Sequence, residues 1–130
     1  MALDPHRLPD EVLAFLAERH LGSLTTLRAD GSPHVVAIGF AFSPAEGLVR
    51  IITARTSAKA ANARRDGARA AVCQVDGARW LSLEGPVTAS TDPGRVVAAE
   101  AAYAARYQQP RPNPERAALE IRVERVLGRA

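Results

Sequence analysis

The sequence predicts a mainly β fold with flanking helices, built as a small closed barrel of antiparallel strands. Short strand-like segments recur along the chain and are separated by turn signals such as Asp30-Gly31 and Asp76-Gly77. Helical patterns are inserted between some of these segments, as in small β-barrels. The chain has 130 residues and an apolar fraction of 47%, so we expect one domain over residues 1–130.

The strands follow from apolar segments bounded by turn residues. They are expected over residues 21–28, 33–42, 48–53, 70–75, 79–88 and 118–126. In the last of these segments, Leu119 and Ile121 alternate with Glu120 and Arg122. This alternation predicts one side facing the core and one facing solvent.

Two helices are expected in the first half of the chain. Apolar residues at helical spacing predict the first over residues 8–19, with Pro9 suited to its first turn. The second is short; it is expected to begin at Thr56 or Ser57 and to be capped at its carboxyl end by Gly67.

A third helix is expected from Asp92 to about residue 107. Asp92 is suited to the N-cap and Pro93 to the first helical position. The prolines of residues 111–114 exclude regular structure in the segment that follows.

Charge and composition narrow the classes of function. The net charge is +3, and the arginines are scattered rather than grouped in a basic run. This does not indicate nucleic-acid binding, and it suits an anionic small molecule. Cys73 is the only cysteine, and the histidines lack metal-ligand spacing, so neither a disulfide nor a metal site is expected. Without an apolar leader or a membrane-length segment, the protein is expected in the cytoplasm.

Lys59 is the only lysine, beside sixteen arginines. In so arginine-rich a chain, a retained lysine indicates a position where a guanidinium does not serve. Lys59 follows the hydroxyls of Thr56 and Ser57 and the cation Arg55 at a helix start, which together predict a phosphate cradle. The alternative is that Thr56 or Ser57 only caps a surface helix and that Lys59 is solvated.

No nucleophile–base pair and no paired carboxylates stand out, so no catalytic side chain is assigned. His34 at a strand start and Glu84 within a strand are each interpreted as structural. Trp80 follows the turn at Asp76-Gly77 and is either a core or interface anchor or a wall for a planar ligand. Redox or other demanding chemistry would therefore come from a bound cofactor.

Four segments carry a resemblance to a known family. They are residues 24–36, 57–62, 75–85 and 106–114, which together span nearly the whole chain. The chain resembles the pyridoxamine 5′-phosphate oxidase-like superfamily of split β-barrels, which includes the FMN-binding split barrels. Within it, the chain is most similar to the branch that uses the deazaflavin coenzyme F420, and there to the biliverdin reductases.

The resemblance implies a homodimer with two cofactor sites at the subunit interface. Residues 33–36 resemble the strand that runs against the deazaflavin ring, and residues 57–62 resemble the turn that holds the phosphate and ribityl chain. Residues 78–80 would reach in from the other subunit. The expected cofactor-binding residues are Pro33, His34, Val35, Val36, Thr53, Arg55, Ser57, Ala58, Lys59, Asn62, Ala78, Arg79 and Trp80.

The same resemblance implies the activity. Reduced F420 would pass a hydride to a conjugated acceptor, with biliverdin, reduced to bilirubin, as the leading candidate. The Arg- and Lys-rich phosphate pattern of the flavin enzymes is only partly present, which disfavours flavin mononucleotide (FMN). The alternatives are an FMN-dependent oxidoreductase of the same fold and a non-catalytic carrier of F420 or a tetrapyrrole. No nucleic-acid or membrane partner is expected.

Overall fold

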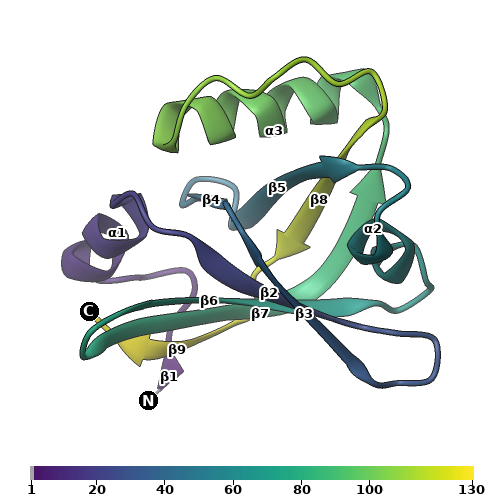
Figure 1. Ribbon diagram of the computed structural model, residues 1–130. Helices are drawn as coiled ribbons and strands as arrows, with labels where there is room; N and C mark the ends of the chain where they lie inside the picture. The colour runs from purple at the N-terminus through teal and green to yellow at the C-terminus, as the bar shows by residue number, and fades with distance from the viewer. Residues whose placement is uncertain (1) are drawn as a thin grey trace.

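Nine antiparallel strands pair into one strongly curved sheet in the computed structural model, which describes residues 2–130 (Figure 1). The strands are β1 (Ala2–Leu3), β2 (Gly22–Leu27), β3 (Pro33–Ile38), β4 (Ala41–Ser43), β5 (Leu48–Ala54), β6 (Arg69–Asp76), β7 (Arg79–Ser90), β8 (Arg116–Arg122) and β9 (Arg125–Arg129). Their main order is β3-β2-β6-β7-β8-β5-β4, and β9 joins β1 to the first half of β7. The prediction of a mainly β barrel with flanking helices is confirmed.

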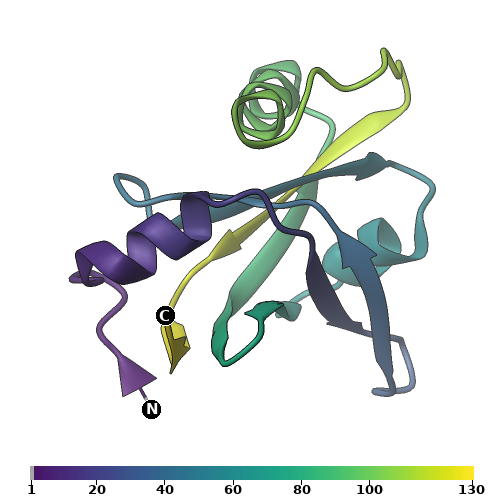
Figure 2. The same ribbon diagram turned by 60° about the vertical axis from the view of Figure 1, so that its left-hand side comes forward.

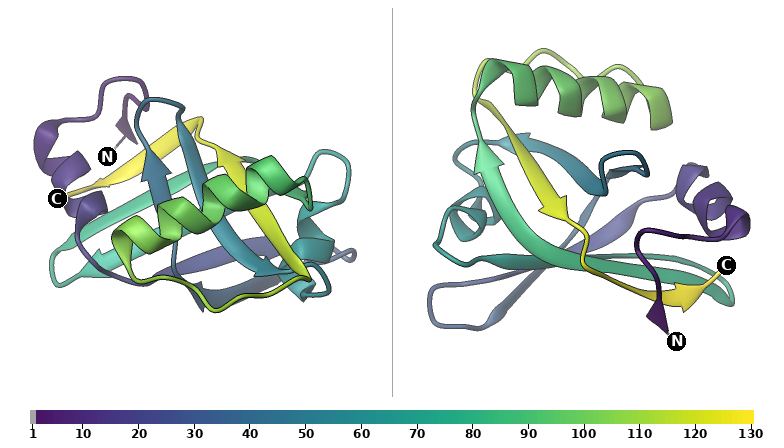
Figure 3. Two further views of the ribbon diagram at one scale, coloured as in Figure 1. Left: turned by 90° about the horizontal axis from the view of Figure 1, so that it is seen from above. Right: turned by 180° about the vertical axis from the view of Figure 1, so that it is seen from behind.

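The long strand β7 belongs to both halves of the barrel. Its first half pairs with β6 and β9, and its second half pairs with β8 (Figure 3). Gly85 lies at the change of partner, where a Cβ would stand 1.8 Å from the carbonyl oxygen of Arg122. Only a residue without a side chain admits this close approach of two backbones.

The core lies between the two halves of the sheet. Side chains that alternate along the strands meet there, and the largest fully buried ones include Leu24, Ile51, Leu81, Leu83 and Leu119. This alternation is the expected result of the two-residue period of β-strands.

Three helices flank the barrel: α1 (Asp10–Ala17), α2 (Ala58–Ala63) and α3 (Pro93–Arg106). Helix α1 closes one end of the barrel with Val12, Phe15 and Leu16, whereas α2 lies near the other end (Figures 1 and 2). Helix α3 crosses β5 and β8 (Figure 3) and buries only Ala99 fully. The expected N-cap at Asp92 is confirmed, since its side chain accepts a hydrogen bond from the backbone N–H of Arg95.

Arg106 attaches the carboxyl end of helix α3 to the barrel. The guanidinium of Arg106 donates to the backbone carbonyls of Phe40 and Glu18 and to the side chain of Gln74, which is itself fully buried. It also lies 4.6 Å from the centre of the Phe40 ring. Burial lowers the pKa of Arg106 from its usual value. These contacts join the end of α3 to the C-cap of α1, to the residue before β4 and to β6 through one side chain.

The predicted strand over residues 33–42 is wrong in one respect, because it is two strands. Strand β3 ends at Ile38, and β4 begins at Ala41 and pairs with β5 in the other half of the barrel. The rings of Tyr103 and Tyr107 lie against Gly39, where a Cβ would come within 3.1 Å of each. The chain therefore leaves the sheet at this glycine to cross between the halves.

The predicted last strand over residues 118–126 is also two strands, β8 and β9. The break follows from two backbone bonds outside the ladder, from Val123 N–H to Gly47 and from Glu124 N–H to Glu84. The solvent-facing position expected for Glu120 is wrong. Its side chain is only 9% exposed and lies beside the guanidinium groups of Arg50 and Arg95 beneath α3.

Smaller corrections concern element ends. Pro9 is the N-cap of α1 rather than a first-turn residue, and α2 ends at Ala63 with Arg64 as its C-cap. Gly67, expected as that cap, has φ +71° in the turn that leads into β6. Strand β1, whose two residues pair with β9, was not predicted.

Candidate functional site

A cavity of about 400 Å³ opens where the two halves of the barrel separate. We call it the Lys59 cavity. The ends of β3 and β5 form one wall, α3 contributes Tyr103, and the irregular segment after α3 forms the rim. Its lining residues are Ile38, Gly39, Ile52, Thr53, Ala54, Lys59, Tyr103, Gln108, Gln109, Pro110, Arg111, Asn113 and Arg116.

The turn before α2 is held by its own hydroxyls. Thr53 Oγ1 donates to Ser57 Oγ at 2.9 Å, and the same Ser57 oxygen accepts from the N–H of Ala60 at 3.2 Å. Ser57, rather than Thr56, is therefore the N-cap of the short helix α2. In this turn Lys59 lines the cavity, whereas Ala58 is exposed and does not line it.

Lys59 and Arg55, expected to act together, have different surroundings. Lys59 is half-buried, lines the cavity and has no hydrogen bond or ion pair within residues 2–130. Arg55 is ion-paired with Glu115, whose carbonyl also accepts the backbone N–H of Arg55 at 2.8 Å. The side chain of Arg55 thus fastens the segment after α3 instead of lining the cavity.

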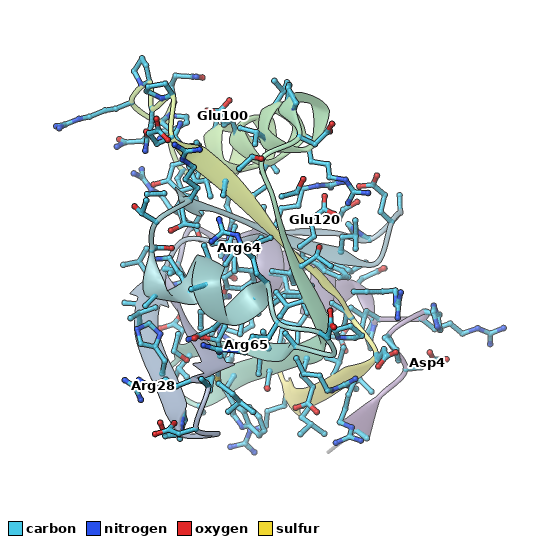
Figure 4. The ribbon with its side chains drawn as sticks, turned by 90° about the vertical axis from the view of Figure 1, so that its right-hand side faces the viewer. Asp4, Arg28, Arg64, Arg65, Glu100 and Glu120 are labelled. Carbon is cyan, nitrogen blue, oxygen red and sulfur yellow. The ribbon has the colours of Figure 1, made fainter. Side chains whose placement is uncertain are left out.

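Asn62 is buried and already has partners. Its Nδ2 donates to Thr26 Oγ1 at 3.0 Å, and its Oδ1 accepts from Arg65 at 2.9 Å. Arg65 also donates to the carbonyl of Leu27 at 2.8 Å, and Figure 4 shows Arg64 and Arg65 beside α2. Asn62 therefore ties α2 to β2 and so sets the position of Lys59.

Strand β3 presents its two faces to different surroundings. His34 pairs in register with the buried Thr26, and its Nδ1 is buried without a hydrogen-bond partner. Val35 points outward and is 59% exposed. With Val36, it lines a shallow groove of about 350 Å³ that Leu21, Gly22, Ser23, Ala37, Cys73 and Val75 complete. Pro33 is exposed at the start of the strand.

The hairpin residues Ala78, Arg79 and Trp80 lie at the far end of β6 from α2 (Figure 1). Since β6 spans eight residues, the two ends are separated by roughly 25 Å. Trp80 is half-buried and pairs in register with Val75. The structure therefore does not bring these residues to the Lys59 cavity of the same chain.

Arg79 is held inside its own chain. Its guanidinium donates to Glu18 at 2.8 and 2.9 Å and to Asp76 at 2.5 Å, and it lies 4.3 Å from the centre of the Phe15 ring. The bond from Arg79 and a second from His20 lower the pKa of Glu18 to about 2. One side-chain oxygen or nitrogen atom from each of Glu18, His20 and Asp76 lies within 4.8 Å of the other two, a cluster that the sequence spacing did not indicate. The guanidinium of Arg79 forms ion pairs with both carboxylates of this cluster.

Sequence reasoning missed the aromatic and polar wall contributed by α3. Tyr103 and Tyr107, the only tyrosines, stand one turn apart with ring centres 5.0 Å apart. With Arg19, His20, Leu21 and Gln108 they line a second cavity of about 300 Å³, which we call the Arg19 cavity. The signal available in the sequence was the pair of tyrosines at the end of a helix, followed by Gln108 and Gln109.

Most cations of the chain are engaged by carboxylates or carbonyls. Within residues 2–130, the exceptions without a side-chain hydrogen bond or ion pair are Arg7, Arg19, Lys59 and Arg111. Lys59 and Arg111 line one cavity, and Arg19 lines the other. Unpaired cations at a concave surface are suited to anionic ligands.

Comparison with known proteins identifies the family. The profile of the pyridoxamine 5′-phosphate oxidase family matches residues 8–130. The chain belongs to this family. The F420H2-dependent biliverdin reductase of Mycobacterium tuberculosis (strain CDC 1551 / Oshkosh) is 58% identical over 124 residues, which cover 95% of this chain and 90% of that protein. The predicted family is therefore confirmed.

Solved structures agree with the family assignment. A conserved hypothetical protein of Mycobacterium tuberculosis superposes with a TM-score of 0.78 at 25% identity, over 94% of this chain and 84% of that one. An F420 reductase superposes with a TM-score of 0.73 at 23% identity, over 92% and 98% of the two chains. At 25% and 23% sequence identity, these structural similarities show a shared fold. No helix within residues 2–130 is long and apolar enough to cross a membrane.

Proposed function

We propose that this member of the pyridoxamine 5′-phosphate oxidase family is an F420-dependent reductase of a conjugated acceptor, biliverdin in the first place. Two findings support the proposal: the relative from Mycobacterium tuberculosis is named for that activity and is 58% identical over most of the chain, and the Lys59 cavity can receive an anionic cofactor. The observation that carries the proposal is Lys59 itself, the only lysine, which lines that cavity and has no side-chain partner among the described residues 2–130.

The cavity residues fit the cofactor in charge and in shape. An ammonium at Lys59 and a guanidinium at Arg111 suit a phosphate and further anionic groups. Gly39, which has no side chain, and the ring of Tyr103 line the same cavity and can pack against a planar group. Reduced F420 held there would supply a hydride and a proton, that is two electrons and two hydrogens in all, which balances the reduction of one conjugated bridge of the acceptor.

The chain's own contribution is to position the ligands. Ser57 and Asn62 fix the turn that carries Lys59, and Arg106 fixes the helix that carries Tyr103. Holding donor and acceptor in contact lowers the entropic part of the barrier without a catalytic acid or base.

We further propose that the protein acts as a homodimer of the single domain 1–130. The outer face of β3, β2, β6 and the start of β7 is poor in charge and carries exposed apolar side chains. Leu21 is 64%, Val35 59% and Val75 61% exposed. Trp80 belongs to the same face by its pairing with Val75. An apolar face of this kind supports association with a second copy, which would bring the hairpin of one chain toward the cofactor of the other.

Cofactor choice tests the proposed function directly. Titration of the protein with F420 and with FMN, side by side, should show at least tenfold tighter binding of F420, or about 1.4 kcal/mol. Equal or reversed affinities would remove the deazaflavin assignment in favour of a flavin enzyme of the same fold. A screen of acceptors with reduced F420 then separates an enzyme from a carrier, because a carrier binds without turnover.

A further inference from the structure

The Arg19 cavity adjoins the Lys59 cavity. Tyr103 and Gln108 line both, so the two hollows meet across these side chains. On its other side, Leu21 lines both the Arg19 cavity and the shallow groove beside Val35. A ligand in the Arg19 cavity would therefore lie against side chains that also line the Lys59 cavity.

The Arg19 cavity carries one unpaired positive charge. Arg19 is exposed and has no hydrogen bond or ion pair in the part of the chain that the structure describes, residues 2–130. The nearest acid in the sequence, Glu18, is fully engaged, since one oxygen accepts from Arg79 and the other from Arg79 and His20. Glu18 is thus neutralised by other groups, and Arg19 stays available for an anion.

The walls of this cavity are aromatic and rigid. The hydroxyl of Tyr107 donates to the carbonyl of His20 at 2.6 Å and accepts from the backbone N–H of Phe40 at 3.2 Å. Tyr103 packs against Tyr107 with the ring planes inclined by 39°. Unlike that of Tyr107, the hydroxyl of Tyr103 has no hydrogen-bond partner within residues 2–130. Rings held in this way suit a flat, conjugated ligand.

We propose that the Arg19 cavity is the acceptor subsite and that Arg19 binds a carboxylate of the acceptor. This inference rests on the proposed function and extends it by naming the specificity-determining residue. The ligand class is a planar, conjugated carboxylic acid, and a linear tetrapyrrole with propionate side chains belongs to that class. Among the described residues 2–130, the Lys59 cavity already offers two cations without a partner, Lys59 and Arg111, for the cofactor. The single such cation at Arg19 is left for the second ligand.

The test is a binding titration that does not depend on turnover. Biliverdin and its dimethyl ester, which lacks both carboxylates, are titrated by absorbance into the wild-type protein loaded with oxidised F420. The same titrations are made with Arg19→Gln and with the matched control Arg122→Gln, whose side chain is 69% exposed at the end of β8 and lines neither cavity.

Arg19→Gln should weaken biliverdin binding by about three- to tenfold, as expected for one partly screened guanidinium–carboxylate pair. Arg19→Gln should leave the affinities of the protein for the dimethyl ester and for F420 unchanged. Arg122→Gln should leave the affinities for all three ligands unchanged. Equal biliverdin affinities for the wild type and Arg19→Gln, an equal loss for the ester, or no biliverdin binding at all would overturn the subsite. Binding that depends on Arg19 without any reduction of biliverdin would support the subsite and refute the proposed function instead.

Discussion

Replacing Lys59 by alanine removes an unpaired cation from the proposed cofactor cavity. Because Lys59 has no partner within residues 2–130, its removal leaves no carboxylate or carbonyl unpaired in the free protein. We therefore expect the free energy of unfolding to change by less than about 0.5 kcal/mol. The full effect of the substitution should appear in the affinity for F420.

The size of that effect follows from the position of the ammonium. Two unit charges 4 Å apart attract by about 4 kcal/mol at the effective dielectric constant near a protein surface. Lys59 is half-buried, so part of this attraction is offset by the loss of its hydration on binding. A loss of about 1.5–3 kcal/mol remains, which corresponds to a charge-assisted hydrogen bond and to at least a tenfold weaker affinity.

The assay is a fluorescence or calorimetric titration with F420, with denaturant unfolding of each variant as a control. Lys59→Arg should recover only part of the lost affinity, because the guanidinium is larger and planar. Arg55→Ala is the informative comparison, because Arg55 is ion-paired with Glu115 and neither residue lines the cavity. This substitution should weaken F420 binding less than Lys59→Ala does. Wild-type affinity in Lys59→Ala would mean that Lys59 is a solvated surface residue and that the phosphate cradle is wrong.

Three further predictions concern assembly, folding and pH. Trp80→Ala should weaken the dimer and F420 binding together, as light scattering and titration can show; a monomer with full affinity for F420 would contradict the shared site. Gly85→Ala should lower the free energy of unfolding in denaturant by at least about 2 kcal/mol, because its Cβ would meet the Arg122 carbonyl at 1.8 Å; a loss below about 0.5 kcal/mol would refute this reading of the crossing. Glu18 has its pKa lowered to about 2, chiefly by Arg79, so its contribution to stability is present above about pH 4.5 and is lost as the pH falls toward 2. Unfolding of Glu18→Gln should accordingly depend less on pH over this range than that of the wild type, and parallel curves would exclude this role.

The sequence predicted the fold where local chemistry decides the structure. Ser57 and Asp92 cap helices as expected, because a side-chain oxygen satisfies a free backbone N–H at a helix start. The turn at Asp76-Gly77 is another local feature, and Gly77 has φ +63°. These features depend on a few neighbouring residues and can be recognised without tertiary contacts.

The sequence did not predict the features that depend on distant parts of the chain. At the break, Gly39 packs against the rings of Tyr103 and Tyr107, which stand more than sixty residues later in the chain. Glu120 stands at a position that the alternating pattern assigns to solvent, but α3 covers it. Arg50 and Arg95 compensate the charge of this buried carboxylate, and the local sequence shows neither partner.

In the candidate site, too, some features could be predicted from the sequence and others depend on distant parts of the chain. Lys59 could be singled out from composition, and the structure places it in a cavity. That Arg55 and Asn62 have partners inside the chain is visible only in three dimensions. The roles of Ala78, Arg79 and Trp80 stay predictions, because in one chain they lie at the far end of β6.

Anaerobic turnover with reduced F420 and biliverdin is the decisive assay of the proposed reductase activity. We expect the protein to form bilirubin and oxidised F420 in equal amounts, at a rate that rises with protein concentration and falls in Lys59→Ala at limiting cofactor. Formation of bilirubin no faster than in a protein-free blank, with F420 bound, would contradict the assignment as a reductase of biliverdin.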